Sequence, residues 1–223
     1  MSRPIAATAR PSPASAPVAL PRLYGTLRGP VRAVLERLFG LSADGLANLP
    51  DGGPYIVAAN HHNYLDGVVL GCVVPPPIAF LVMPRVWRAT PLHPYFHRGI
   101  GSIPIDLDRP DSGALRRALT ALAAGRVVGI FPEGPFSVRG RLERGLPGVG
   151  LLALRSGVPV VPAAILGTYE ALAGRRFYVP RRRPFVVRFG RPRRFTAAAF
   201  PSPRVARREV TERIMADIAD LLA

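Results

Sequence analysis

With 223 residues, of which 48% are hydrophobic and 20% charged, the chain has the composition of one globular domain, which excludes an intrinsically disordered protein. Its formal net charge is +16 and every basic residue is arginine, so we expect it to associate with a polyanion, either an anionic membrane surface or nucleic acid. A single cysteine, Cys72, excludes an intrachain disulfide, and its apolar surroundings in the sequence favour a place in the core.

The first 22 residues contain five prolines among alanines and serines, and they contain no continuous apolar stretch. We therefore expect a flexible tail there, without a secretory signal or a membrane span, and a single domain over residues 23–223. Between residues 27 and 41, apolar side chains recur at helical spacing with arginines between them. This pattern predicts a helix that either packs on the core or lies on a membrane as a basic amphipathic helix.

Residues 67–84 form the longest uncharged stretch, 18 residues, which is a marginal length for a membrane span. Three prolines at positions 75–77 interrupt it, so a helix, a turn and a strand over residues 78–83 are the better interpretation. No transmembrane helix is expected.

After residue 100, predicted strands and helices alternate, as they do in a sheet covered by helices. Across the chain, the expected strands cover residues 55–59, 78–83, 102–106, 127–131, 158–166 and 185–189, and further helices are expected over residues 112–124, 146–155 and 210–221. The strands near residues 127 and 158 are apolar nearly throughout, which predicts an α/β fold with a mostly parallel, twisted sheet and helices on both faces. Ligands of such folds usually bind beyond the carboxyl ends of the strands.

The run NHHNYLDG at positions 60–67 contains the strongest candidate for a site. His61 and Asp66 are five residues apart, so a continuous helix would point their side chains roughly 140° apart. They can meet only across a turn, and the sequence supplies one between the strand that ends at Ala59 and the following helix. That arrangement places a general base beside the carboxylate that orients it. His62, four residues from the aspartate, is the alternative base.

The chain contains four blocks in order: NHHNYLDG at 60–67, IPIDLDR at 103–109, FPEG at 131–134 and VPVVPAAILG at 158–167. Together they resemble the glycerolipid acyltransferases of the 1-acylglycerol-3-phosphate acyltransferase (lysophospholipid acyltransferase) type. The resemblance covers roughly residues 50–170 and implies the α/β sandwich of that family. It also implies transfer of a fatty acyl group from a thioester, acyl-CoA or acyl carrier protein, to a hydroxyl of a lysophospholipid or glycerol phosphate.

The resemblance also implies roles for single residues. His61 takes the proton from the acceptor hydroxyl, and Asp66 orients and charges it. Arg109 matches a phosphate-binding arginine, and Glu133 and Gly134 match an acceptor-binding loop. Asn63 stands where the family commonly has serine and is expected to contact substrate through a hydrogen bond.

The chemistry is consistent with these residue types. An acceptor alcohol has a pKa far above 7, so it needs a base within hydrogen-bond reach before it attacks a thioester. A histidine fixed by a carboxylate serves this purpose in serine hydrolases, and here the substrate hydroxyl would take the place of the serine. No G-x-S-x-G nucleophile motif occurs in the sequence. His93 and His97 belong to no closely spaced ligand set, so we expect neither a metal nor another cofactor besides the thioester co-substrate.

Two departures from the family pattern concern the acceptor. Leu107 and Asp108 lengthen the block before Arg109, which leaves its contact with phosphate open. Phe136 stands where the family has an arginine after FPEG, and Arg139 or Arg141 could replace the missing charge.

The segment from Ala171 to Arg208 contains 12 arginines and no acidic residue. Its aromatic residues are Phe177, Tyr178, Phe185, Phe189 and Phe195. This pattern fits contact with an anionic membrane, rings that point into the core, or single-stranded nucleic acid. We favour the membrane, because no nucleic-acid-binding signature accompanies the arginines. The sequence therefore predicts a cytoplasmic acyltransferase attached peripherally to a membrane. The alternative is a non-catalytic protein on the same fold that binds anionic lipid or nucleic acid.

Overall fold

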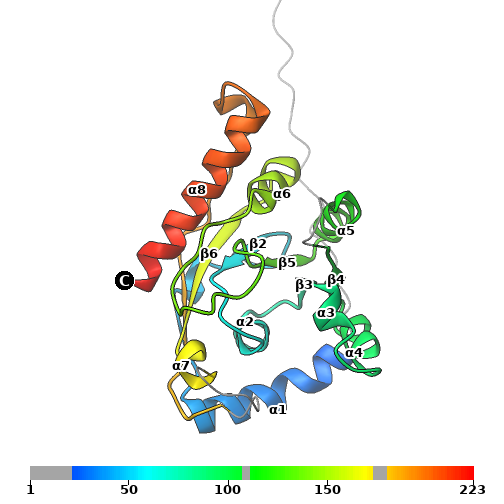
Figure 1. The fold of residues 1–223 in the computed structure, drawn as a ribbon, viewed down its shortest axis with the longest axis vertical. Helices are drawn as coiled ribbons and strands as arrows, with labels where there is room; N and C mark the ends of the chain where they lie inside the picture. The colour runs from blue at the N-terminus through cyan, green and yellow to red at the C-terminus, as the bar shows by residue number, and fades with distance from the viewer. Residues whose placement is uncertain (1–21, 107–110, 173–179) are drawn as a thin grey trace, which may run out of the picture.

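A seven-stranded sheet in the order β1-β7-β6-β2-β5-β3-β4 forms the centre of the computed structural model, which describes residues 22–106, 111–172 and 180–223 (Figure 1). The strands are β1 (Ser42–Asp44), β2 (Ile56–Ala59), β3 (Ile78–Val82), β4 (Ile103–Pro104), β5 (Val127–Ile130), β6 (Val160–Leu166) and β7 (Val186–Phe189). From β6 to β4, neighbouring strands are parallel, whereas β7 pairs with β6 in the antiparallel direction. The predicted α/β fold with a mostly parallel sheet is confirmed.

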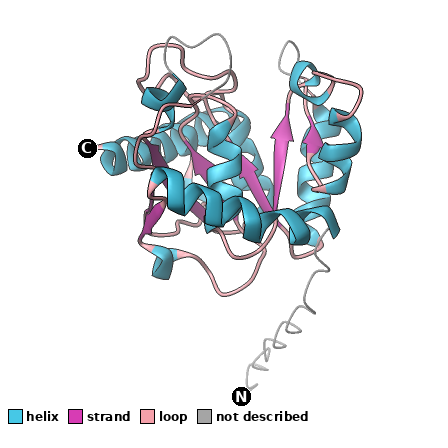
Figure 2. Ribbon diagram, turned by 90° about the horizontal axis from the view of Figure 1, so that it is seen from below, coloured by secondary structure: helices cyan, strands magenta, loops and turns pink. Residues whose placement is uncertain are grey.

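Helices cover both faces of the sheet (Figures 1 and 2). They are α1 (Arg22–Phe39), α2 (Leu65–Val73), α3 (Pro84–Trp87), α4 (His93–Gly99), α5 (Ser112–Ala123), α6 (Gly148–Ser156), α7 (Thr168–Leu172) and α8 (Pro203–Leu222), with short 3-10 helices at Leu46–Asn48 and Ala197–Ala199. One buried cluster joins α1 and α2 to the sheet, and a second joins α5, α6 and α8 to its other face.

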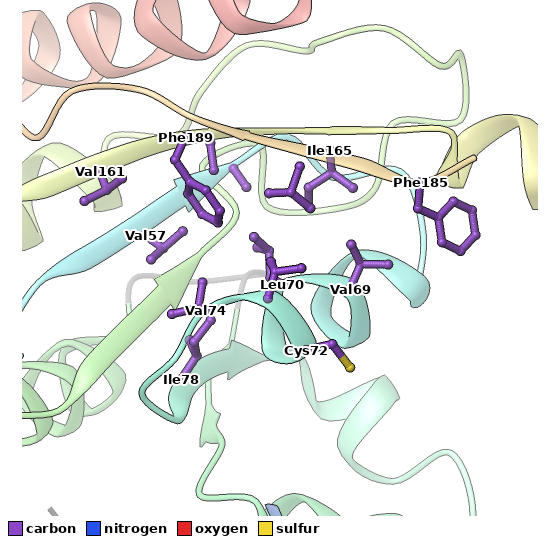
Figure 3. Close-up of a cluster of buried hydrophobic side chains, with 14 of the residues drawn as sticks. Val57, Val69, Leu70, Cys72, Val74, Ile78, Val161, Ile165, Phe185 and Phe189 are labelled. Atoms are coloured by element: carbon purple, nitrogen blue, oxygen red, sulfur yellow. The ribbon is translucent and has the colours of Figure 1, made fainter. Parts of the chain in front are cut away.

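The first cluster fixes the helix that follows the candidate site. Figure 3 shows Leu70 on the side of α2 that faces Val57 of β2 and Ile165 of β6, and all three side chains are buried. Burial of each such side chain stabilises the fold by about 1.5–3 kcal/mol. Cys72 is buried in the same cluster, as predicted.

Most of the predicted elements are present, with ends shifted by a few residues. The predicted strand over residues 102–106 is reduced to the two residues of β4. Four elements were not predicted: β1, which pairs with Val186–Arg188, and the helices α3, α4 and α7. The predicted tail lies outside the described residues except for Arg22, where α1 begins. None of the described helices has the length and hydropathy needed to cross a membrane.

The aromatic residues of the arginine segment do not follow the favoured prediction. Phe185, Phe189 and Phe195 are buried, so these three rings point into the core and are not available to a lipid surface. Phe177 and Tyr178 lie outside the described residues. The prediction that the rings of this segment contact a membrane is therefore wrong for the three described rings. The side chains of Arg181, Arg182 and Arg183 are exposed.

Candidate active site

His61 and Asp66 meet across the turn between β2 and α2. His61 leaves the end of β2, Asp66 lies in the first turn of α2, and His61 Nδ1 is 2.8 Å from Asp66 Oδ2. The same carboxylate oxygen accepts hydrogen bonds from the backbone N–H groups of His62 (2.6 Å) and Asn63 (2.8 Å). Asp66 is fully buried, so these contacts fix both the turn and the imidazole. The predicted geometry of the pair is confirmed.

The second ring nitrogen of His61 is left for a ligand. A carboxylate can only accept a hydrogen bond from Nδ1–H, so the proton is assigned to Nδ1 and Nε2 carries the lone pair. Within the described chain, Nε2 makes no hydrogen bond, and His61 lines a large cavity. The ring of Phe131 stacks on the imidazole at 3.8 Å between centroids, and Phe136 meets it edge-on at 5.0 Å. The imidazole is therefore held in one orientation at the cavity wall.

His62 occupies a different environment. Its ring lies 5.6 Å from that of Tyr169, and its Nε2 is buried without a hydrogen-bond partner among the residues described. Burial lowers the pKa of His62, and this effect outweighs the opposing influence of Asp66. Since His62 is absent from the cavity lining, the geometry favours His61 over its neighbour as the reactive histidine.

Asn63 and Glu133 are bonded to the backbone of the protein and do not line the cavity. The Asn63 amide donates to the Thr168 carbonyl (2.8 Å) and accepts from the Leu65 N–H (2.9 Å). Glu133 accepts from the N–H groups of His61 and Glu143, each at 2.7 Å. Burial raises the pKa of Glu133, and these two hydrogen bonds oppose the shift. Asn63 and Glu133, predicted to contact substrate, thus hold the backbone around the site through their hydrogen bonds.

Replacement of Glu133 by glutamine should lower the free energy of unfolding by about 1–3 kcal/mol, because one amide oxygen cannot satisfy both N–H groups. Turnover should fall as well, since the backbone of His61 loses an anchor. Thermal melting and initial rates measure the two effects. Glu143→Gln is the matched control, because only its backbone N–H contacts Glu133. Equal melting temperatures for Glu133→Gln and wild type would contradict this role.

A cavity of about 960 Å³ opens at the carboxyl ends of β2, β3 and β5. Its walls are mainly apolar and come from the sheet and from helices on both of its faces. They include Leu27, Val31, Val68, Phe80, Phe96 and Leu152. Gly134 lines the cavity, as its predicted role requires, whereas Arg109 lies outside the described residues. The volume is at the upper end of the range of about 300–1,000 Å³ that is usual for ligand sites.

One cation near His61 comes from α3, a helix that the sequence pattern did not predict. The Arg85 guanidinium lies over the ring of Phe136, 5.7 Å from its centroid, and the imidazole of His61 meets the same ring edge-on. Arg141 is instead near Glu143 (3.8 Å). Among the described residues, the arginines that line the cavity itself are Arg28 and Arg207, and Arg85, Arg139 and Arg141 are not part of its lining. Phe136 stands where the family pattern has an arginine, and its ring contacts the guanidinium of Arg85 from α3.

Asn60 is a further residue whose role the sequence did not predict. Its side chain is fully buried and bonds both backbone groups of Ile165, donating at 2.9 Å and accepting at 2.7 Å. These bonds connect the block at residues 60–67 to β6. The residues that the structure describes contain no group of three or more His, Cys, Asp or Glu side chains placed to hold a metal ion.

The chain is similar to several known acyltransferases. Residues 41–166 match the family model described as Acyltransferase. A 1-acyl-sn-glycerol-3-phosphate acyltransferase of Bacillus subtilis is 24% identical over 149 residues, 65% of this chain and 72% of that protein. The chloroplastic enzyme LPAT1 of Arabidopsis thaliana is 29% identical over 58% of this chain but only 37% of its own length.

A solved structure has the same fold. The 1-acyl-sn-glycerophosphate acyltransferase PlsC of Thermotoga maritima superposes with a TM-score of 0.70, covering 90% of this chain and 81% of that one, at 23% identity. The family match covers more than half of the chain and includes the histidine–aspartate turn, the loop after β5 and β6. The chain therefore belongs to the acyltransferase family of the 1-acylglycerol-3-phosphate acyltransferase type.

Proposed function

We propose that the protein transfers a fatty acyl group from a thioester to a hydroxyl of a phosphorylated glycerolipid such as a lysophospholipid. The observation that carries this proposal is the His61–Asp66 pair, whose unbonded Nε2 belongs to the wall of an apolar cavity. The mechanism requires a base within reach of the acceptor hydroxyl and an apolar space for an acyl chain, and this arrangement supplies both.

The proposed reaction runs in one direct transfer. Nε2 of His61 accepts the proton of the acceptor hydroxyl while the oxygen attacks the carbonyl carbon of the thioester. A tetrahedral intermediate forms, its C–S bond breaks, and the departing sulfur takes the proton back from the imidazolium. Asp66 stabilises the imidazolium during these steps, as the aspartate does in the serine hydrolases. The products are an ester and a free thiol, and no enzyme nucleophile is consumed.

Arg85 supports a phosphorylated acceptor. Its guanidinium and the imidazole of His61 both contact the ring of Phe136. None of the ion pairs found in the described parts of the chain includes Arg85, so its charge is available to an anion. A phosphate bound at Arg85 would leave the neighbouring glycerol hydroxyl on the side of His61. Arginine suits this purpose because its planar fork matches phosphate oxygens.

A direct assay tests the proposal. Purified protein is incubated with labelled palmitoyl-CoA and a panel of acceptors that contains lysophosphatidic acid, lysophosphatidylglycerol and unphosphorylated monoacylglycerol. We expect ester formation with a phosphorylated acceptor and at least about tenfold lower efficiency with monoacylglycerol, which corresponds to about 1.4 kcal/mol. The proposal fails if no acceptor in the panel is acylated, and the phosphate assignment fails if monoacylglycerol is preferred.

We further propose that the enzyme works at an anionic membrane surface through the mouth of the cavity. Leu27, Val68 and Phe96 are exposed and also line the cavity, and Leu92 (75% exposed) and Tyr95 (70% exposed) lie beside them on and before α4. Arg85 and Arg88, on and directly after α3, are exposed as well, and α3 packs against α4. Apolar side chains surrounded by arginines are typical of surfaces that enter the headgroup layer.

Replacement of Leu92 and Tyr95 by serine should weaken binding to phosphatidylglycerol vesicles by about tenfold, which corresponds to about 1.4 kcal/mol of lost apolar burial. Vesicle sedimentation measures the affinity. Val138→Ser removes another exposed apolar side chain (83% exposed) away from the cavity lining and is the control. If Arg181→Ala, Arg182→Ala and Arg183→Ala together abolish binding while the serine variant retains it, the docking surface is wrong.

A further inference from the structure

A second cleft, of about 690 Å³, lies between α5 and residues 98–103 and is lined by four arginines, Arg98, Arg116, Arg117 and Arg126. No acidic residue in the described part of the chain lines this cleft. Ser102 lines both this cleft and the cavity that contains His61. The four-arginine cleft is thus strongly positive and adjoins the proposed active site.

Arg126 shows that the cleft is a built feature and not only a group of surface charges. Its guanidinium is partly buried and donates to the carbonyl of Gly101 (3.1 Å), and burial lowers the pKa of Arg126. Gly101 has a φ of 75°, and a side chain there would collide with this guanidinium. The guanidinium of Arg126 is therefore held against the backbone at Gly101 and is partly removed from water.

The charges of the cleft are poorly neutralised by the protein itself. Over the described ranges, Arg98, Arg116 and Arg126 have no carboxylate partner, and Arg117 is 3.6 Å from Asp111. A partly buried cation without a counter-charge costs free energy, and a bound anion offsets that cost. Guanidinium groups form paired hydrogen bonds with phosphate oxygens, so a ligand with several phosphates fits the cleft.

We infer that the four-arginine cleft binds the phosphate groups of coenzyme A while the thioester end of the donor reaches the cavity at His61. This inference rests on the proposed function. The phosphates of coenzyme A and its sulfur lie at opposite ends of a long pantetheine arm, so the donor needs two connected sites. The cleft follows α5 from Gly113 to Ala124, which is about 16 Å at ~1.5 Å per residue, and Ser102 lines both the cleft and the cavity.

The test compares charge reversals inside and outside the cleft. Arg98→Glu with Arg116→Glu reverses two exposed charges of the cleft. Arg155→Glu with Arg204→Glu reverses two exposed charges that line neither cavity. Calorimetry with coenzyme A alone should show binding at least about tenfold weaker for the cleft variant and unchanged for the control. The KM for palmitoyl-CoA should rise in parallel, whereas turnover of palmitoyl-pantetheine, which has no phosphate, should stay at the wild-type rate.

Each result is decisive. Equal affinity of the cleft variant and the control for coenzyme A overturns the inference. A second result also overturns it: the wild-type protein does not bind coenzyme A but accepts acyl groups from acyl carrier protein, and the cleft variant loses that activity. The cleft would then bind an acidic protein. If wild type binds coenzyme A through the cleft but acylates no acceptor, the inference stands and the proposed function fails.

Discussion

Replacement of His61 by alanine should lower the rate of acyl transfer by about 10²–10⁴-fold, which is the usual contribution of a general base. The KM for the thioester should change little, because the cavity and the arginines remain. The reason is geometric: His61 Nε2 is the nitrogen that reaches the cavity, and Asp66 holds the proton on Nδ1. Initial rates with palmitoyl-CoA and lysophosphatidic acid measure the effect.

His62→Ala is the matched control for this experiment. It removes the same side chain one residue later, where the ring faces Tyr169 and not the cavity. We expect it to retain turnover within about tenfold of wild type, a difference of about 1.4 kcal/mol in the barrier. Thermal melting of both variants separates a loss of the base from a loss of the stacking between His61 and Phe131. Full turnover by His61→Ala, or a larger loss in His62→Ala, would refute the assignment of the base.

The sequence predicted those parts of the site that depend on local chain direction. The strand that ends at Ala59, the turn and the helix that contains Asp66 are consecutive, so periodicity alone locates the meeting point of the pair. The turn at His61 and the loop at Gly134 both follow parallel strands, beyond whose carboxyl ends ligands usually bind, and both line the cavity.

The parts that escaped prediction depend on contacts between distant segments. Nothing near Glu133 in the sequence shows that its carboxylate accepts from the N–H of His61, 72 positions earlier. Likewise, Arg85 reaches Phe136 only because β3 and β5 are neighbours in the sheet. Phe185, Phe189 and Phe195 looked available for lipid because arginines surround them, but all three are buried. Alternation along β7, which lies between β1 and β6, places Phe185 and Phe189 in one core cluster, and Phe195 packs in the cluster on the other face. The residue types made Glu133 and the three phenylalanines candidates for the site or the membrane surface, and the packing of distant segments showed their structural roles.

Replacement of Asp66 by asparagine separates the charge of this residue from its hydrogen bonds. The asparagine carbonyl can occupy the place of Oδ2 and accept from His61, His62 and Asn63. Its amide nitrogen then occupies the place of Oδ1, an atom that has no hydrogen-bond partner in the described residues. We therefore expect the variant to fold, with thermal melting close to wild type.

Turnover of Asp66→Asn should nevertheless fall by about 10³-fold, because the imidazolium formed during the reaction loses its counter-charge. Two unit charges about 4 Å apart interact by about 4 kcal/mol at an effective dielectric constant near 20, and this corresponds to about three powers of ten in rate. Asp217→Asn is the control. Asp217 lies on α8, pairs with Arg193 (2.6 Å) and does not line the cavity. A folded Asp66→Asn variant with the wild-type rate would show that the negative charge of Asp66 does not act on the transition state, and the proposed mechanism would then fail at this step.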